Sequence, residues 1–83
     1  MYDLLYDRRI EKDLRPLPHA VRRLILQRIE LLAIQPRRPQ VEKLTGSDRY
    51  RMRVGDYRVL LTIDDHRKAV TVYRILHRRE AYR

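Results

Sequence analysis

The stretch RYRMRVGDYRVLLTID, residues 49–64, constrains the fold of this chain more than any other segment. On both sides of Gly55 and Asp56, polar and apolar residues alternate, which is the period-two pattern of a half-buried strand. A Gly-Asp pair supplies the positive backbone dihedral that a two-residue hairpin turn needs. The stretch therefore predicts a hairpin of two strands, residues 49–54 and 57–64, with one apolar and one polar face.

The polar face of this hairpin is rich in arginine. The apolar row is Tyr50, Met52, Val54, Tyr57, Val59, Leu61 and Ile63, and the opposite row contains Arg49, Arg51, Arg53 and Arg58. Such a row is either a solvated strand face or an anion site. Facing like charges destabilise a sheet, and no carboxylate shares these rows, whereas exposed faces usually mix both signs. The pattern therefore favours a phosphate or carboxylate site where Arg51, Arg53 and Arg58 gather.

The remaining segments predict a sheet with helices beside it. Residues 2–7 are predicted to form a strand, and a short helix with Asp7 as its N-cap follows. Apolar residues at helical spacing predict a second helix over about residues 18–35. Residues 36–46 are predicted to be a loop, and residues 69–76 a last strand that forms a second hairpin with residues 57–64.

The predicted order is β-α-α-β-β-β within a single domain, residues 1–83. It corresponds to an α+β fold in which two N-terminal helices pack on one face of a small twisted antiparallel sheet. The other face of the sheet stays open. The apolar stripe of the second helix, expected to pack on the hairpin, consists of Val21, Leu24, Ile25, Ile29 and Leu32.

The composition excludes several classes of protein. The 83 residues include no cysteine, so disulfides and thiolate metal sites are ruled out. The three histidines show no metal-ligand spacing, and we expect neither a metal nor a cofactor. No apolar run approaches the roughly 20 residues of a membrane helix, and no signal peptide opens the chain. We therefore expect a cytoplasmic protein that does not associate with membranes.

The charge points to a polyanionic or acidic partner. The formal net charge is +9, and +7 of it falls on residues 36–83. A basic half in a small domain favours nucleic acid or an acidic protein as the partner. Only three of the 20 basic residues are lysines, and the planar guanidinium group of arginine suits bidentate phosphate contacts.

The C-terminal segment ILHRREAYR adds further basic and aromatic groups. It is either a frayed basic tail or a site that stacks a base and holds its phosphate, since cations, an aromatic ring and an imidazole occur together. Its candidate residues are His77, Arg78, Arg79, Tyr82 and Arg83.

The segment KLTGSDRYRMRVGDYRVLLTIDD, together with the later VTVYRILHRREAY, resembles the RelE branch of the RelE/ParE toxin superfamily of type II toxin–antitoxin modules. The resemblance covers residues 43–82 closely and the N-terminal half in layout. It implies a RelE-like fold and an mRNA interferase, an endoribonuclease that binds the ribosomal A site beside 16S rRNA and cleaves the mRNA there. The ribose 2′-hydroxyl attacks the adjacent phosphate, and a 2′,3′-cyclic phosphate remains. It also implies an acidic cognate antitoxin that wraps the toxin in a heteromeric complex.

The resemblance also implies roles for single residues. Arg51 and Arg53 match strand positions where basic catalytic residues occur, commonly lysines. Arg58 matches an arginine that stabilises phosphate charge, Arg78 one that helps the leaving group, and Tyr82 a tyrosine that stacks on or acts at the cleaved nucleotide. The further residues expected to contact RNA are Arg49, His77, Arg79 and Arg83.

Arginine at the usual lysine positions leaves the general base open. A guanidinium group does not lose its proton in proteins, so Arg51 and Arg53 can stabilise charge but cannot take the 2′-hydroxyl proton. Tyr82 and His77 are the candidates, and rRNA or in-line alignment is the alternative. Two other functions also stay open: a ParE-like inhibitor of DNA gyrase without nuclease activity, and an inactive protein that only binds its antitoxin.

Overall fold

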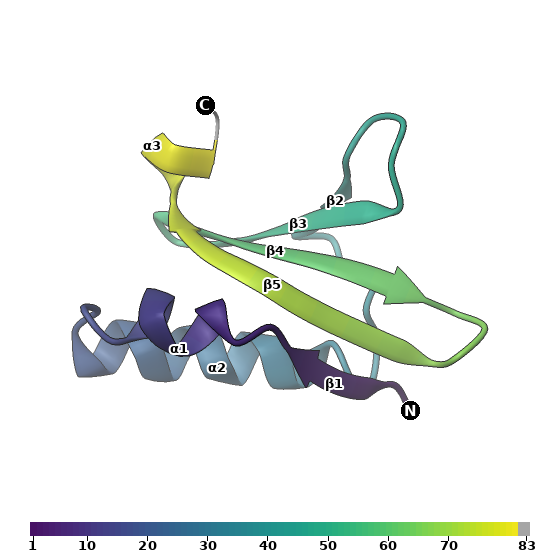
Figure 1. Cartoon of the computed structure of the whole chain (residues 1–83), viewed down its shortest axis with the longest axis horizontal. Coiled ribbons are helices and arrows are strands. Elements are labelled where there is room, and N and C mark those ends of the chain that lie inside the picture. The colour runs from purple at the N-terminus through teal and green to yellow at the C-terminus, as the bar shows by residue number, and fades with distance from the viewer. Residues whose placement is uncertain (82–83) are drawn as a thin grey trace.

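One five-stranded sheet organises the structure, and the long helix α2 crosses one of its faces (Figure 1). The computed structural model describes residues 1–81. The elements are β1 (Asp3–Tyr6), α1 (Arg9–Leu14), α2 (His19–Leu31), β2 (Val41–Lys43), β3 (Arg49–Val54), β4 (Tyr57–Asp64), β5 (Ala69–His77) and α3 (Arg78–Ala81). The strand order is β1-β5-β4-β3-β2. This α+β architecture confirms the predicted fold class.

The predicted hairpin is present with the expected bounds. β3 and β4 pair antiparallel, with Val54 opposite Tyr57 and Arg53 opposite Arg58. Gly55 has φ +58°, the left-handed conformation that glycine adopts without strain at the first position of such a turn. The predicted alternation of apolar and polar faces is also present in β3, where Tyr50, Met52 and Val54 are buried.

The core lies between α2 and the apolar face of the sheet. Ile25, Ile29 and Leu32 are fully buried, and they face buried side chains of β3, β4 and β5. Leu24, expected in the same stripe, is exposed instead. It follows Arg23 on the helix, outside the arc that contacts the sheet.

Three features differ from the predicted layout. β1 runs parallel to β5, so the sheet is not antiparallel throughout. β2 lies in the segment predicted to be a loop and pairs antiparallel with β3. A four-residue helix, α3, follows β5 directly and lies on the side of the sheet away from α1 and α2 (Figure 1). No helix within residues 1–81 is long and apolar enough to cross a membrane.

Candidate functional site

The arginines of β3 and β4 line a cleft of about 110 Å³, which we call the arginine cleft. Its lining residues are Pro39, Gln40, Glu42, Arg51, Arg53 and Arg58. The strands supply the three arginines from the row opposite the buried apolar residues, on the face that α1 and α2 leave open. The predicted gathering of Arg51, Arg53 and Arg58 is therefore confirmed.

Arg58 is the most rigidly held member of the arginine cleft. Among the charged residues in the part of the chain that the structure describes, Arg58 alone is buried, with 7% of its surface exposed. Its Nη1 donates hydrogen bonds to the carbonyl oxygens of Gly55 at 3.0 Å and Tyr57 at 2.9 Å. These carbonyls belong to the hairpin turn, so the turn fixes the direction of the guanidinium group.

Arg53 lies directly opposite Arg58 in the β3–β4 ladder, and its side chain is exposed. Facing cations repel each other in the absence of a counter-charge. An anion bound between the two guanidinium groups would relieve this repulsion. A phosphate held here would meet one buried and one exposed guanidinium group.

Glu42 brings a carboxylate to the same cleft. It lies opposite Arg51 in the β2–β3 ladder, and its Oε1 is 3.4 Å from Arg51 Nη2. The side chain of Arg51 is 17% exposed, whereas that of Glu42 is 71% exposed. No carboxylate lies in the arginine rows of β3 and β4 themselves, but the neighbouring strand β2 brings one beside Arg51. The sequence gives only a weak signal for strand β2. Its three residues, Val41–Lys43, show a single alternation of apolar and polar side chains within a segment rich in proline and turn residues.

Arg78 reaches the same end of the sheet from the start of α3. Its backbone N–H donates to the carbonyl oxygen of Asp56 at 2.7 Å, which joins α3 to the β3–β4 turn. Its Nη1 lies 3.9 Å from Asp56 Oδ1, and both side chains are exposed. Such an exposed pair contributes little, so Arg78 can turn toward a ligand.

Arg49 and His77 lie outside the arginine cleft. The guanidinium carbon of Arg49 is 5.4 Å from the ring centroid of Tyr73, a cation–π contact. The ring of His77 meets that of Tyr57 edge-on at 5.4 Å and 82°, and its Nδ1 accepts the backbone N–H of Arg79 at 3.3 Å. Arg79 is exposed.

Two of the predicted site residues, Tyr82 and Arg83, lie outside the described residues. Within residues 1–81, no group of three or more His, Asp or Glu side chains is placed to hold a metal ion. The charged side chains that line the arginine cleft are three guanidinium groups and one carboxylate.

A helix-covered sheet whose open face carries clustered arginines defines a small basic α+β protein, and similarity to known proteins places this protein in a family. The sequence model described as ParE toxin of type II toxin–antitoxin system, parDE, matches residues 4–82. No curated protein matches. The chain belongs to the RelE/ParE superfamily of type II toxins, in its RelE-like branch.

Solved structures agree with this assignment. A chain of the archaeal RelE–RelB complex from Pyrococcus horikoshii OT3 is 31% identical, with a TM-score of 0.83 over 93% of this chain and 94% of that one. A chain of the RelBE2 toxin–antitoxin complex from Mycobacterium tuberculosis is 25% identical, with a TM-score of 0.82. The match covers 92% of this chain and 96% of that one. A chain of the intact Escherichia coli RelBE complex is 27% identical, with a TM-score of 0.76. The match covers 90% of this chain and 94% of that one.

Proposed function

We propose that this protein is a ribosome-dependent mRNA endoribonuclease, an mRNA interferase that stops translation by cutting the message in the ribosomal A site. The observation that carries the proposal is the arginine cleft, where three arginines from two strands and one carboxylate line a single small space. Membership in the RelE-like branch supports the same reaction class.

The arginines suit the electrostatic part of RNA cleavage. When the ribose 2′-oxygen attacks the neighbouring phosphorus, negative charge grows on the non-bridging oxygens while the bond to the 5′-oxygen breaks. Preorganised donors aimed at that charge lower the barrier. We assign this role to Arg58 and Arg53, which face each other across the ladder, with Arg51 as a third donor. Arg78 would stabilise the departing 5′-oxygen.

We assign the general base to Glu42. The 2′-hydroxyl must lose a proton, and the arginines cannot accept one. The Glu42 carboxylate lines the arginine cleft and stays mostly exposed beside Arg51, so a bound ribose can reach it. A glutamate carboxylate serves as a general base when it lies within hydrogen-bond reach of the proton that it takes. Glu42 is favoured over His77, which does not line this cleft. Tyr82 lies outside the described residues and stays a candidate.

An acidic antitoxin is the proposed protein partner. The similar structures from P. horikoshii, M. tuberculosis and E. coli are toxin–antitoxin complexes. The net charge of +9 on this chain favours an acidic protein that covers the arginine cleft and keeps RNA out. Together they would form a heteromeric toxin–antitoxin complex in the cytoplasm.

Inhibition of DNA gyrase without nuclease chemistry is the second candidate function, because the matching sequence model is that of the ParE toxin. A reconstituted translation reaction and a gyrase supercoiling assay, run with the same protein preparation, separate the two. The interferase proposal predicts new mRNA 5′ ends within codons, only with ribosomes present, and unchanged supercoiling. Intact mRNA with blocked supercoiling would establish the gyrase alternative, and no effect in either assay would leave a protein that only binds its antitoxin.

A further inference from the structure

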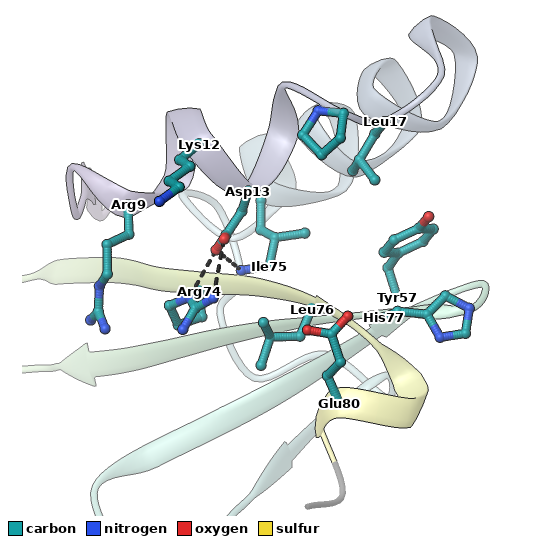
Figure 2. A pocket seen from close by; sticks show the side chains of 11 residues that line it. Arg9, Lys12, Asp13, Leu17, Tyr57, Arg74, Ile75, Leu76, His77 and Glu80 are labelled. Atoms are coloured by element: carbon teal, nitrogen blue, oxygen red, sulfur yellow. Dashed lines mark hydrogen bonds and ion pairs between the residues drawn. The ribbon is translucent and has the colours of Figure 1, made fainter.

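A second, larger cleft lies between α1 and the C-terminal part of β5, and we call it the α1–β5 cleft (Figure 2). Its volume is about 520 Å³, within the roughly 300–1,000 Å³ of small-molecule sites. Its lining residues are Arg9, Lys12, Asp13, Pro16, Leu17, Tyr57, Arg74, Ile75, Leu76, His77 and Glu80. None of these residues lines the arginine cleft.

The two ends of the α1–β5 cleft differ in chemistry. Arg9 and Lys12 lie at one end, and Leu17, Tyr57 and His77 lie at the other (Figure 2). The basic end suits an anion. The other end, where the Glu80 carboxylate lies beside the aromatic and aliphatic side chains, suits a flat ring whose N–H groups that carboxylate can accept. A ligand that fills the cleft therefore carries a negative charge at one end and a planar ring at the other.

The wall between the two ends is fixed before any ligand binds. Asp13, whose side chain is 11% exposed, accepts hydrogen bonds from Arg74 Nε at 2.9 Å and Arg74 Nη2 at 3.2 Å. It also accepts the backbone N–H of Ile75 at 2.9 Å. Asp13 and Arg74 thereby neutralise each other. At the basic end, Arg9 Nε pairs with Asp7 Oδ1 at 3.0 Å. Lys12 forms no ion pair within residues 1–81, so its charge is the one that remains for an anion.

The α1–β5 cleft and the arginine cleft meet at the same end of the sheet. Tyr57 and Arg58 are consecutive on β4, so their side chains leave the strand on opposite faces. Arg58 lines the arginine cleft, and Tyr57 lines the α1–β5 cleft. A single RNA strand that passes around the end of β4 would contact both clefts.

We propose that the α1–β5 cleft binds one nucleotide of the RNA whose backbone is cut in the arginine cleft, with the nucleotide's phosphate at Arg9 and Lys12 and its base against Tyr57 and Leu17. A nucleotide carries both required groups, whereas an acidic peptide side chain supplies the charge without the ring. The assignment names an RNA subsite and so rests on the proposed function.

The test is an NMR titration of the isolated, isotope-labelled chain with 5′-AMP, CMP, GMP and UMP at millimolar concentrations. Inorganic phosphate and glutamate serve as charge-only probes. We expect the nucleotides to shift the amide signals of Lys12, Leu17, Tyr57 and His77 more than either probe does. Lys12→Ala should weaken nucleotide binding about tenfold, whereas Lys43→Ala, which removes an exposed lysine outside both clefts, should not change it.

Equal shifts with phosphate or glutamate would overturn the proposal, because the cleft would then recognise charge alone. Shifts confined to the arginine cleft, or no shifts at all, would also overturn it while leaving the proposed nuclease intact. Conversely, nucleotide binding at the α1–β5 cleft in a protein that cuts no mRNA during translation would refute the proposed function and keep the subsite. The two failures are therefore distinguishable.

Discussion

Burial separates the arginines of the arginine cleft into two kinds. Arg58 is held by two turn carbonyls and is almost inaccessible, whereas Arg53 on the facing strand is exposed. A buried guanidinium group is preorganised toward a transition state, but its removal also disturbs the fold. Arg53 is therefore the better residue for testing catalysis without a loss of stability.

Glu42→Gln tests the general base. The amide keeps the size of the side chain but cannot take a proton, so we expect the cleavage rate to fall about 100- to 10,000-fold. Binding of the ribosome and message should persist, because the arginines remain. Single-turnover cleavage on programmed ribosomes measures the rate, and Lys43→Ala on the same strand is the control. Cleavage at the wild-type rate would return the base to His77, Tyr82 or rRNA.

Asp65 links three distant segments and gives the protein an acid-sensitive contact. Arg37 donates hydrogen bonds to its two carboxylate oxygens at 2.9 and 2.8 Å, and the Tyr2 hydroxyl donates one at 2.7 Å. The hydrogen bonds from Arg37, and then that from Tyr2, lower the pKa of Asp65 to about 2. An unfolded aspartate titrates near pH 4, so this stabilisation is complete above about pH 4 and is lost as pH falls toward about 2.

Asp65→Asn should therefore lower the melting temperature at neutral pH, and the difference from wild type should shrink as pH falls from about 4 to about 2. Thermal unfolding followed by circular dichroism across this pH range measures the effect. Asp48→Asn, at an exposed loop position, is the matched control and should leave the profile unchanged. A deficit in Asp65→Asn that stays constant down to pH 2 would contradict the assigned link.

At the scale of elements, Asp13 anchors α1 to β5. Its carboxylate accepts three hydrogen bonds from Arg74 and Ile75, and α1 buries only Ile10. Asp13→Ala leaves the Arg74 guanidinium group and the Ile75 N–H without this partner, which should destabilise the protein by about 2–3 kcal/mol. Urea unfolding measures the change.

The control for Asp13→Ala is Glu11→Ala on the same helix. Glu11 pairs with Arg15 at 3.5 Å, and both side chains are exposed, so the expected loss is below about 0.5 kcal/mol. Equal decreases in the free energy of unfolding of the two variants would show that the buried position of Asp13 adds nothing to stability.

The elements that the sequence predicted are those with a long periodic pattern. The alternation of residues 49–64 was sufficient for β3 and β4, and the helical spacing for α2. β2 and α3 span three and four residues, too few for a period to show. β2 exists because β3 offers an unpaired edge, and the parallel pairing of β1 depends on the whole fold.

The same limit applied to the candidate site. Arg51, Arg53 and Arg58 were predictable as one group because strand periodicity alone places them on one face. Glu42 and the α1–β5 cleft were not predictable, because both depend on the register between segments distant in sequence. The pairing of Asp13 with Arg74, 61 residues apart, left no local signal.

At the scale of the whole molecule, the net charge of +9 should govern how fast an acidic antitoxin binds. Raising the ionic strength from about 0.05 to about 0.5 M should slow association at least tenfold, because exposed charges are screened. The dissociation rate should change much less. Stopped-flow mixing of the toxin with its antitoxin measures both rates, and an association rate indifferent to salt would contradict electrostatic steering.

The most direct test of the proposal that the arginine cleft cuts RNA compares Arg53→Ala with Arg23→Ala in single-turnover mRNA cleavage on ribosomes. Both variants remove one exposed arginine, but Arg23 lies on α2, across the sheet from the cleft. We predict a loss of about 100- to 1,000-fold in the cleavage rate for Arg53→Ala and wild-type cleavage for Arg23→Ala. Equal rates in the two variants would contradict the assignment of RNA cleavage to the arginine cleft.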